Sequence, residues 1–88
     1  MTAFRSPREI ALDIKSDYMD RGKSVPAPAE AYRAPAEFLD SWDAWYFDDD
    51  AETVMIYLLS NLGGWRGETA RQVKAEIKAG LASCKDNR

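Results

Sequence analysis

Apolar side chains recur at helical spacing in two stretches of this chain, and that pattern constrains its fold more than any other feature. From residue 70 to residue 84 the apolar positions are separated by three or four residues: Ala70, Val73, Ile77, Leu81 and Cys84. An equally regular set follows residue 53: Val54, Met55, Leu58, Leu59 and Leu62. Such spacing places an apolar stripe along one side of an α-helix. It predicts helices from Gly67 to Cys84 and from Ala51 to Asn61.

Glycines and a tryptophan beside or within these two helices carry further information. Gly63-Gly64 follows the first of them and predicts a left-handed C-terminal stop. Trp65 is expected to fill the corner between the two helices. Gly80 lies inside the second, where glycine costs up to ~1 kcal/mol relative to alanine. It indicates either close packing against another segment or a fraying helix end.

A further helix is predicted near the N-terminus. Ser6, Pro7 and Glu9 supply a capping residue, a first-turn proline and the reciprocal capping-box acid. Ile10, Ile14 and Tyr18 follow at intervals of four and share one face. The pattern predicts a helix from Pro7 to Met19.

Four prolines interrupt the pattern, three of them between residues 26 and 35. Val25–Pro28 is expected to be extended, because proline disfavours a helical conformation in the preceding residue. Ala29–Arg33 is expected to form a helical turn, and Pro35 either ends it or opens a helix from Ala36 to Trp42. Alternation of apolar and polar residues, which would indicate a strand, is absent. The predicted fold is therefore all-α: one domain over residues 1–88, built as a bundle of three to four helices.

Composition removes several classes of function. The 88 residues contain no histidine and one cysteine, Cys84. The usual catalytic triads and most zinc sites are excluded by this composition. We therefore expect no enzymatic activity, no cofactor and no metal. Neither a run of about 18 apolar residues nor a signal-peptide core is present, so we expect a cytoplasmic protein with no membrane contact.

The segment Asp40–Glu52 holds six carboxylates and four aromatic rings in thirteen residues, without a basic residue. One interpretation is that the rings enter the core while Asp48, Asp49 and Asp50 begin a helix. The other is an acidic surface that presents aromatic rings to a basic partner, in place of phosphates. Its candidate partner-binding residues are Asp43, Trp45, Tyr46, Asp48, Asp49, Asp50 and Glu52. The acids of this segment do not have the spacing of an EF-hand calcium site.

Charge is divided unevenly along the chain. Residues 25–64 carry one basic residue against eight acids, whereas residues 65–88 carry six against three. The C-terminal bases define an alternative nucleic-acid-binding site: Arg71, Lys74, Lys78 and Lys85. These bases could also form an ordinary solvated helix face. In a third interpretation, the acidic middle of one copy pairs with the basic helix of another. The resulting homo-oligomer would dissociate in high salt.

The C-terminal half contains a predicted apolar helix at residues 50–61 and the run Trp65-Arg66-Gly67-Glu68-Thr69-Ala70-Arg71, followed by Lys74-Ala75-Glu76. In these residues it resembles a group of small proteins encoded by phages and integrative elements. The resemblance implies an accessory protein of a mobile element. Small acidic proteins in that setting often inhibit host defence or regulatory machinery, in the manner of anti-CRISPR and antirestriction proteins. We therefore expect a protein that binds a host protein with a basic surface. Nucleic-acid binding through the C-terminal helix is the alternative.

Overall fold

A computed structural model describes residues 4–86 of the chain, and the side chains of residues 4–84. Four helices and two short strands follow one another in this range: α1 (Pro7–Asp20), α2 (Ala27–Ala36), β1 (Trp45–Tyr46), β2 (Asp49–Asp50), α3 (Ala51–Ser60) and α4 (Glu68–Asp86). The fold is thus mostly helical.

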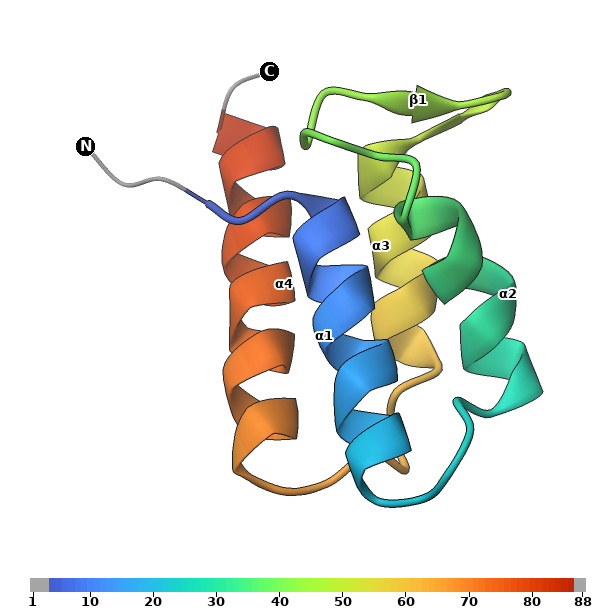
Figure 1. The fold of residues 1–88 in the computed structure, drawn as a ribbon. Helices are drawn as coiled ribbons and strands as arrows, with labels where there is room; N and C mark the ends of the chain where they lie inside the picture. The colour runs from blue at the N-terminus through green and yellow to red at the C-terminus, as the bar shows by residue number, and fades with distance from the viewer. Residues whose placement is uncertain (1–3, 87–88) are drawn as a thin grey trace.

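The helices alternate in direction, and each packs against its neighbours in the sequence (Figure 1). The fourth helix, α4, returns to pack against α1 and closes the bundle. This arrangement brings the β1–β2 hairpin, the N-terminal segment and the end of α4 to one end of the molecule (Figure 1). The α1–α2 and α3–α4 connections lie at the other end.

The start of α1 is capped as the sequence predicts. The backbone N–H of Glu9 donates to Ser6 Oγ at 3.2 Å, and the backbone N–H of Ser6 donates to Glu9 Oε1 at 3.1 Å. Two of the donors that every helix N-terminus leaves unpaired are thereby satisfied. The helix runs one residue beyond the predicted end.

The predicted apolar stripes form the core. Fifteen apolar residues of the described range are buried in one cluster: Ile10, Ala11, Ile14, Ala29, Ala36, Leu39, Ala51, Val54, Met55, Leu58, Leu62, Trp65, Ala70, Val73 and Ile77. Leu59, Leu81 and Tyr18 pack against it while partly exposed. The periodicity therefore predicts α1, α3 and α4 and their buried faces.

The region of the prolines was predicted only in part: the helical turn at Ala29–Arg33 is present but belongs to a longer helix. Ala27–Ala36 is one helix, with Pro28 in its first turn and Pro35 inside it. Proline is tolerated early in a helix because the N–H groups there have no helical acceptor. Pro35 lacks the N–H that would bond to the fourth residue before it, and α2 ends at the next residue. The predicted helix from Ala36 to Trp42 does not form; the chain turns there instead.

Two further expectations need correction. The fold is not purely all-α, since β1 and β2 form a two-stranded antiparallel sheet. Gly63 and Gly64 do not adopt a left-handed conformation. The end of α3 is closed by Asn61, whose Nδ2 donates to the carbonyl oxygen of Tyr57 at 2.8 Å.

Two arginines connect segments that are far apart in the sequence. Arg33 is buried in α2, where it pairs with Glu30 and Glu37 and donates to the carbonyl oxygen of Ala11 in α1 at 3.3 Å. Arg5 donates to both carboxylate oxygens of Glu76 in α4, at 2.7 and 2.6 Å. The N-terminal segment is thus held against α4, beside the hairpin.

The lengths and apolar character of the described helices can be compared with those of a membrane span. None of those within residues 4–86 combines the length and the apolar character needed to cross a bilayer.

Candidate functional site

The acidic-aromatic segment forms the β1–β2 hairpin at one end of the bundle. Trp45 pairs with Asp50 and Tyr46 with Asp49, so Phe47 and Asp48 form a two-residue turn. The second strand continues directly into α3, whose first N–H, that of Ala51, donates to the carbonyl oxygen of Ala44 at 3.0 Å. The hairpin is therefore anchored to the start of a core helix.

Phe47 occupies the tip of the hairpin in a strained conformation. Its φ angle is 56°, in the left-handed region, and it is the one non-glycine residue with a positive φ in the described range. Two-residue hairpin turns usually place glycine at such a position, because a Cβ is disfavoured there. A residue held in this region costs about 1–3 kcal/mol. Despite this cost the ring is not buried: 86% of Phe47 is exposed.

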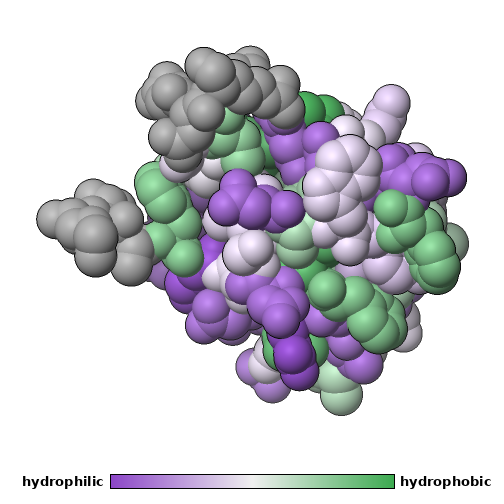
Figure 2. Space-filling view, turned by 90° about the horizontal axis from the view of Figure 1, so that it is seen from above, coloured by the Kyte–Doolittle hydropathy of each residue, from purple (hydrophilic) through white to green (hydrophobic). Residues whose placement is uncertain are grey.

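A cluster of three aromatic rings covers one side of the hairpin; we call it the aromatic cluster, and it consists of Phe38, Tyr46 and Phe47. The ring of Tyr46 lies 5.7 Å from that of Phe38 and 4.7 Å from that of Phe47, edge to face with the latter. Phe38 is itself 69% exposed. Apolar and hydrophilic surface thus adjoin at this end of the molecule, which Figure 2 views from above.

The sequence did not identify Phe38 as part of the site. Phe38 lies, with Leu39 and Trp42, inside the helix predicted from Ala36 to Trp42, and that helix does not form. Leu39 alone of the three is fully buried.

The predicted acidic residues divide into two groups. Asp43, Asp48 and Asp49 are exposed on and beside the hairpin. Asp50 caps α3, because its Oδ1 accepts from the backbone N–H of Thr53 at 2.8 Å. Glu52, in the first turn of α3, is only 8% exposed. Asp50 thus starts a helix, as the first interpretation predicts, whereas Asp48 and Asp49 face solvent beside an exposed ring.

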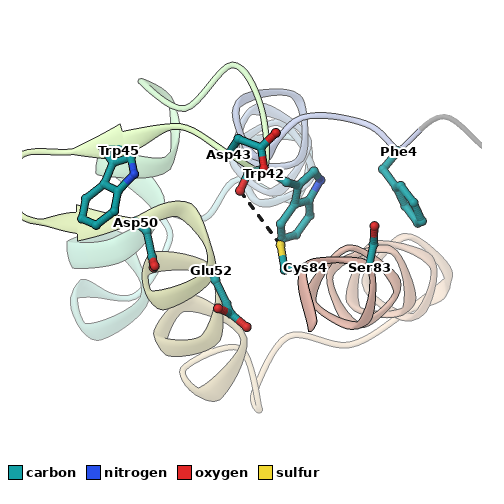
Figure 3. Close-up of a pocket in the computed structure, with 8 residues that line it drawn as sticks. All are labelled: Phe4, Trp42, Asp43, Trp45, Asp50, Glu52, Ser83 and Cys84. Atoms are coloured by element: carbon teal, nitrogen blue, oxygen red, sulfur yellow. Dashed lines mark hydrogen bonds between the residues drawn. The ribbon is translucent and has the colours of Figure 1, made fainter. Parts of the chain in front are cut away.

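Trp45 belongs to a pocket between the hairpin and the end of α4; we call it the tryptophan pocket. Its volume is about 340 Å³, and its lining includes Phe4, Trp42, Asp43, Trp45, Asp50, Glu52, Ser83 and Cys84 (Figure 3). The hairpin and the start of α3 contribute one wall, and α4 contributes the other. Trp45 is 65% exposed, so most of its indole is accessible to a partner.

Trp42 is the fixed wall of the tryptophan pocket. Its Nε1 donates to the carbonyl oxygen of Arg5 at 2.9 Å, and its ring lies directly against Gly80 of α4. Gly80 is therefore a packing site rather than a fraying end. Trp42 is one of the four rings of Asp40–Glu52, but no local pattern in the sequence predicts that Phe4 and Cys84 line the same pocket.

The carboxylates of the pocket influence the thiol of Cys84. Burial raises the pKa of Cys84, and the negative charges of Asp43 and Asp50 raise it further. The same carboxylates do not form a metal site: in the part of the chain described, no three Asp, Glu, His or Cys side chains are arranged to hold a metal ion.

The alternative nucleic-acid site is arranged less favourably. Arg71 pairs with Glu68, one turn away on the exposed side of α4. Lys74 Nζ donates to the carbonyl oxygen of Trp65 at 2.7 Å. Lys78 is exposed, and the side chain of Lys85 lies outside the described residues. Two of the three described bases thus already have partners within the fold.

The residues of the W-R-G-E-T-A-R signature build the corner between α3 and α4. Trp65 is buried, stacks on Tyr18 with ring centroids 6.0 Å apart, and donates through Nε1 to Asp17 at 2.7 Å. Gly67 has a φ of 112°, and a Cβ there would meet the guanidinium of Arg21. The expected role of Trp65 is confirmed, and the signature describes a corner of the fold.

Known proteins provide no further guide to this site. Comparisons with protein-family models, with curated proteins and with solved structures find no match for the chain. Function must therefore be argued from the hairpin, the aromatic cluster and the tryptophan pocket.

Proposed function

We propose that this protein binds another protein through the hairpin end of its bundle and thereby modulates it. The observation that carries the proposal is Phe47, a large ring held in a strained left-handed turn and still 86% exposed. Backbone strain of this kind clusters at functional sites, so an observed outlier supports a hypothesis of function. Aromatic rings in turn dominate the energy of many protein interfaces. The exposed ring can therefore anchor a partner. Its backbone strain destabilises the fold, and burial of the ring within the fold does not offset that strain.

The chemistry of the hairpin indicates the partner. Asp48 follows Phe47 directly, and Asp49 and Asp43 are exposed nearby. Acidic groups around an apolar anchor suit a partner surface rich in lysine and arginine, where they speed association and discriminate against acidic partners. Proteins that handle nucleic acids have such surfaces, because they bind phosphates. We therefore propose a nucleic-acid-handling host protein as the target.

The resemblance to mobile-element accessory proteins supports the same direction. Under this proposal the chain acts in the cytoplasm of the host, without enzymatic activity, as an inhibitor of the anti-CRISPR or antirestriction type. The hairpin takes the place of phosphates on the target. Nucleic-acid binding by Arg71, Lys74 and Lys78 is the competing proposal.

A pull-down with hairpin variants tests the proposal. Tagged wild-type protein is compared with Phe47→Ala and with the double change Asp48→Lys and Asp49→Lys, using nuclease-treated host lysate. Asp50 is left intact because it caps α3. We expect a stoichiometric partner in the wild-type sample and its loss with both variants.

Matched controls lie at the opposite end of the bundle. Met19 and Asp20 are exposed at the end of α1, so Met19→Ala removes an exposed apolar side chain and Asp20→Lys reverses a single charge away from the hairpin. Both should retain the partner. A partner that survives the hairpin changes would overturn the proposal. Capture of nucleic acid alone, once the nuclease is omitted, would favour α4 instead.

A further inference from the structure

The two faces of the β1–β2 hairpin belong to different surfaces of the molecule. Paired residues of an antiparallel sheet share a face, and successive residues alternate between faces. Trp45 and its partner Asp50 line the tryptophan pocket beside α4 (Figure 3). Tyr46 and its partner Asp49 therefore lie on the other face, where Asp49 lines a second hollow together with residues of α2 and α3.

This second hollow is aromatic, and we call it the tyrosine groove. Its volume is about 290 Å³, and its lining includes Tyr32, Asp49, Thr53, Val54 and Tyr57. The rings of Tyr32 and Tyr57 stack with their centroids 5.3 Å apart, so they join α2 to α3. Because Tyr57 is 51% exposed, this pair of rings is open to solvent.

The tyrosine groove and the aromatic cluster form one surface. Tyr46 packs against the other two rings of the cluster and shares its face of the hairpin with Asp49, which lines the groove. Phe38 follows the end of the helix that carries Tyr32. Exposed apolar surface of this kind marks sites of interaction on soluble proteins.

The charge of the tyrosine groove is negative. Asp49 is its charged lining residue, and it makes no ion pair within the part of the chain described. Arg33 is the one basic residue between positions 25 and 64, and it is buried in ion pairs on α2. A partner segment that carries positive charge therefore complements this groove.

We propose that the tyrosine groove binds a proline-rich, arginine-bearing segment of the partner protein. Proline rings pack on the stacked tyrosines, and an arginine pairs with Asp49. This inference rests on the proposed function, and it identifies the kind of segment that the surface beside the hairpin recognises. Aromatic-lined grooves are a recurring means of binding such segments, which adopt the polyproline II conformation.

Tyrosine hydroxyls favour an extended segment over a helix. Tyr32, Tyr46 and Tyr57 place their hydroxyls on this surface, and none of these hydroxyls has a hydrogen-bond partner among the described residues. A tyrosine hydroxyl can donate to a carbonyl oxygen. A helix uses its carbonyl oxygens internally, whereas a polyproline II segment has no internal hydrogen bonds and leaves them free. Pairing with a β-strand is disfavoured, because β1 and β2 are only two residues long.

The groove is built on the packed part of the fold. Val54, at its base, belongs to the hydrophobic core and is 3% exposed. The two stacked tyrosines lie on helices that pack against each other. A site that is already formed lowers the entropic cost of binding, and a proline-rich segment loses little freedom of its own.

Three synthetic peptides of equal length test the proposal with the ¹⁵N-labelled full chain. The first is proline-rich and carries two arginines, the second replaces both arginines with citrulline, and the third replaces the prolines with alanine. Backbone and indole N–H signals are followed by NMR. We expect saturable shifts at Thr53 and Tyr57 with the first peptide and severalfold weaker binding of the other two. The indole signal of the buried Trp65, at the opposite end of the bundle, should not shift.

Variants locate the binding on the protein. Tyr57→Phe keeps the ring and removes the hydroxyl, and it should weaken binding of the arginine peptide about threefold or more. Tyr18→Phe is the matched control, since Tyr18 stacks on Trp65 away from the groove. Asp49→Asn should weaken binding about threefold and reduce its dependence on salt. Asp20→Asn, at the end of α1, should change neither.

Three results would overturn the proposal. They are the absence of saturable shifts with the arginine peptide, tighter binding of the alanine peptide, and an unchanged affinity of Tyr57→Phe.

The two proposals can fail separately. Phe47 is not among the residues that line the groove, so Phe47→Ala should lose the partner and still bind the arginine peptide. If the peptide fails to bind while partner capture still depends on Phe47, only the groove proposal falls. If the peptide binds while capture survives the hairpin changes, only the proposed function falls.

Discussion

The indole of Trp42 lies where any residue other than glycine at position 80 would place its Cβ. The contact joins the segment before β1 to the buried side of α4, and the hydrogen bond from Trp42 to Arg5 holds the ring in position. A glycine that weakens its own helix is thus required by tertiary packing. The hairpin end of the bundle is built around this contact.

Gly80→Ala should therefore destabilise the protein. Alanine normally stabilises a helix interior by up to ~1 kcal/mol relative to glycine. Here the added methyl group meets the ring of Trp42, and we expect a net loss of about 1–3 kcal/mol in the free energy of unfolding, as in overpacked cores. In a Trp42→Ala background the sign should reverse, because the methyl group then meets no ring. Urea unfolding of the four proteins measures both effects, and a stabilising Gly80→Ala in the wild-type background would contradict the contact.

Phe47→Gly should be more stable than Phe47→Ala. Both variants lose the contact with Tyr46, but only glycine relieves the left-handed φ of 56°. Strain relief of ~1–3 kcal/mol exceeds the ~0.4–1 kcal/mol by which glycine favours the unfolded chain. We expect a difference of about 1 kcal/mol in thermal or urea unfolding. Equal stability of the two variants would show that position 47 is unstrained, and would remove the main support for the hairpin as an interface.

Lys74 and Lys78 should behave differently when their charge is removed. Lys74→Met leaves the carbonyl oxygen of Trp65 without the lysine donor 2.7 Å away, which should cost about 1 kcal/mol of stability. Lys78 is exposed, and Lys78→Met should change stability by less than about 0.5 kcal/mol. If α4 bound nucleic acid, both changes would instead weaken that binding alike. Unfolding curves and a gel-shift assay at low salt distinguish the two cases.

Helices α1, α3 and α4 could be predicted because their signals are local. A capping box, an apolar stripe and a following polar turn lie within a few residues of one another, and side chains three or four apart share a face in any helix. Helix α2 could not be predicted in the same way. Its prolines are tolerated only because of where the helix begins and ends, and its buried Arg33 depends on contacts with α1.

The sequence predicts which residue types make up the site, but not how they are arranged. The density of charge and rings in residues 40–52 is visible in the sequence, but the two-residue strands are too short to show alternation. Which ring is exposed depends on the turn at Phe47 and on the path of the chain after α2. The tryptophan pocket depends on still longer-range contacts: Trp42 and Cys84, 42 positions apart in the sequence, meet across it.

The reactivity of Cys84 reports the charge of that pocket. Its Sγ lies 4.0 Å from the carbonyl oxygen of Trp42, and its pKa is raised above the ordinary value of 9.0 by burial and by Asp43 and Asp50. The thiolate is the reactive form, so alkylation by iodoacetamide near pH 8 should be slow. The rate should rise with pH, with a midpoint above that of a free thiol.

Asp43→Asn should accelerate this alkylation severalfold at pH 8. Removing a negative charge near the thiol stabilises the thiolate, lowers the pKa of Cys84 and raises the reactive fraction at a given pH. Asp48→Asn removes the same charge from the hairpin turn, outside the pocket lining, and should leave the rate unchanged. Equal rate–pH midpoints for the wild-type protein and Asp43→Asn would mean that the field of Asp43 does not reach the pocket. The strained ring of Phe47 would still support binding through the hairpin, because it does not depend on this charge.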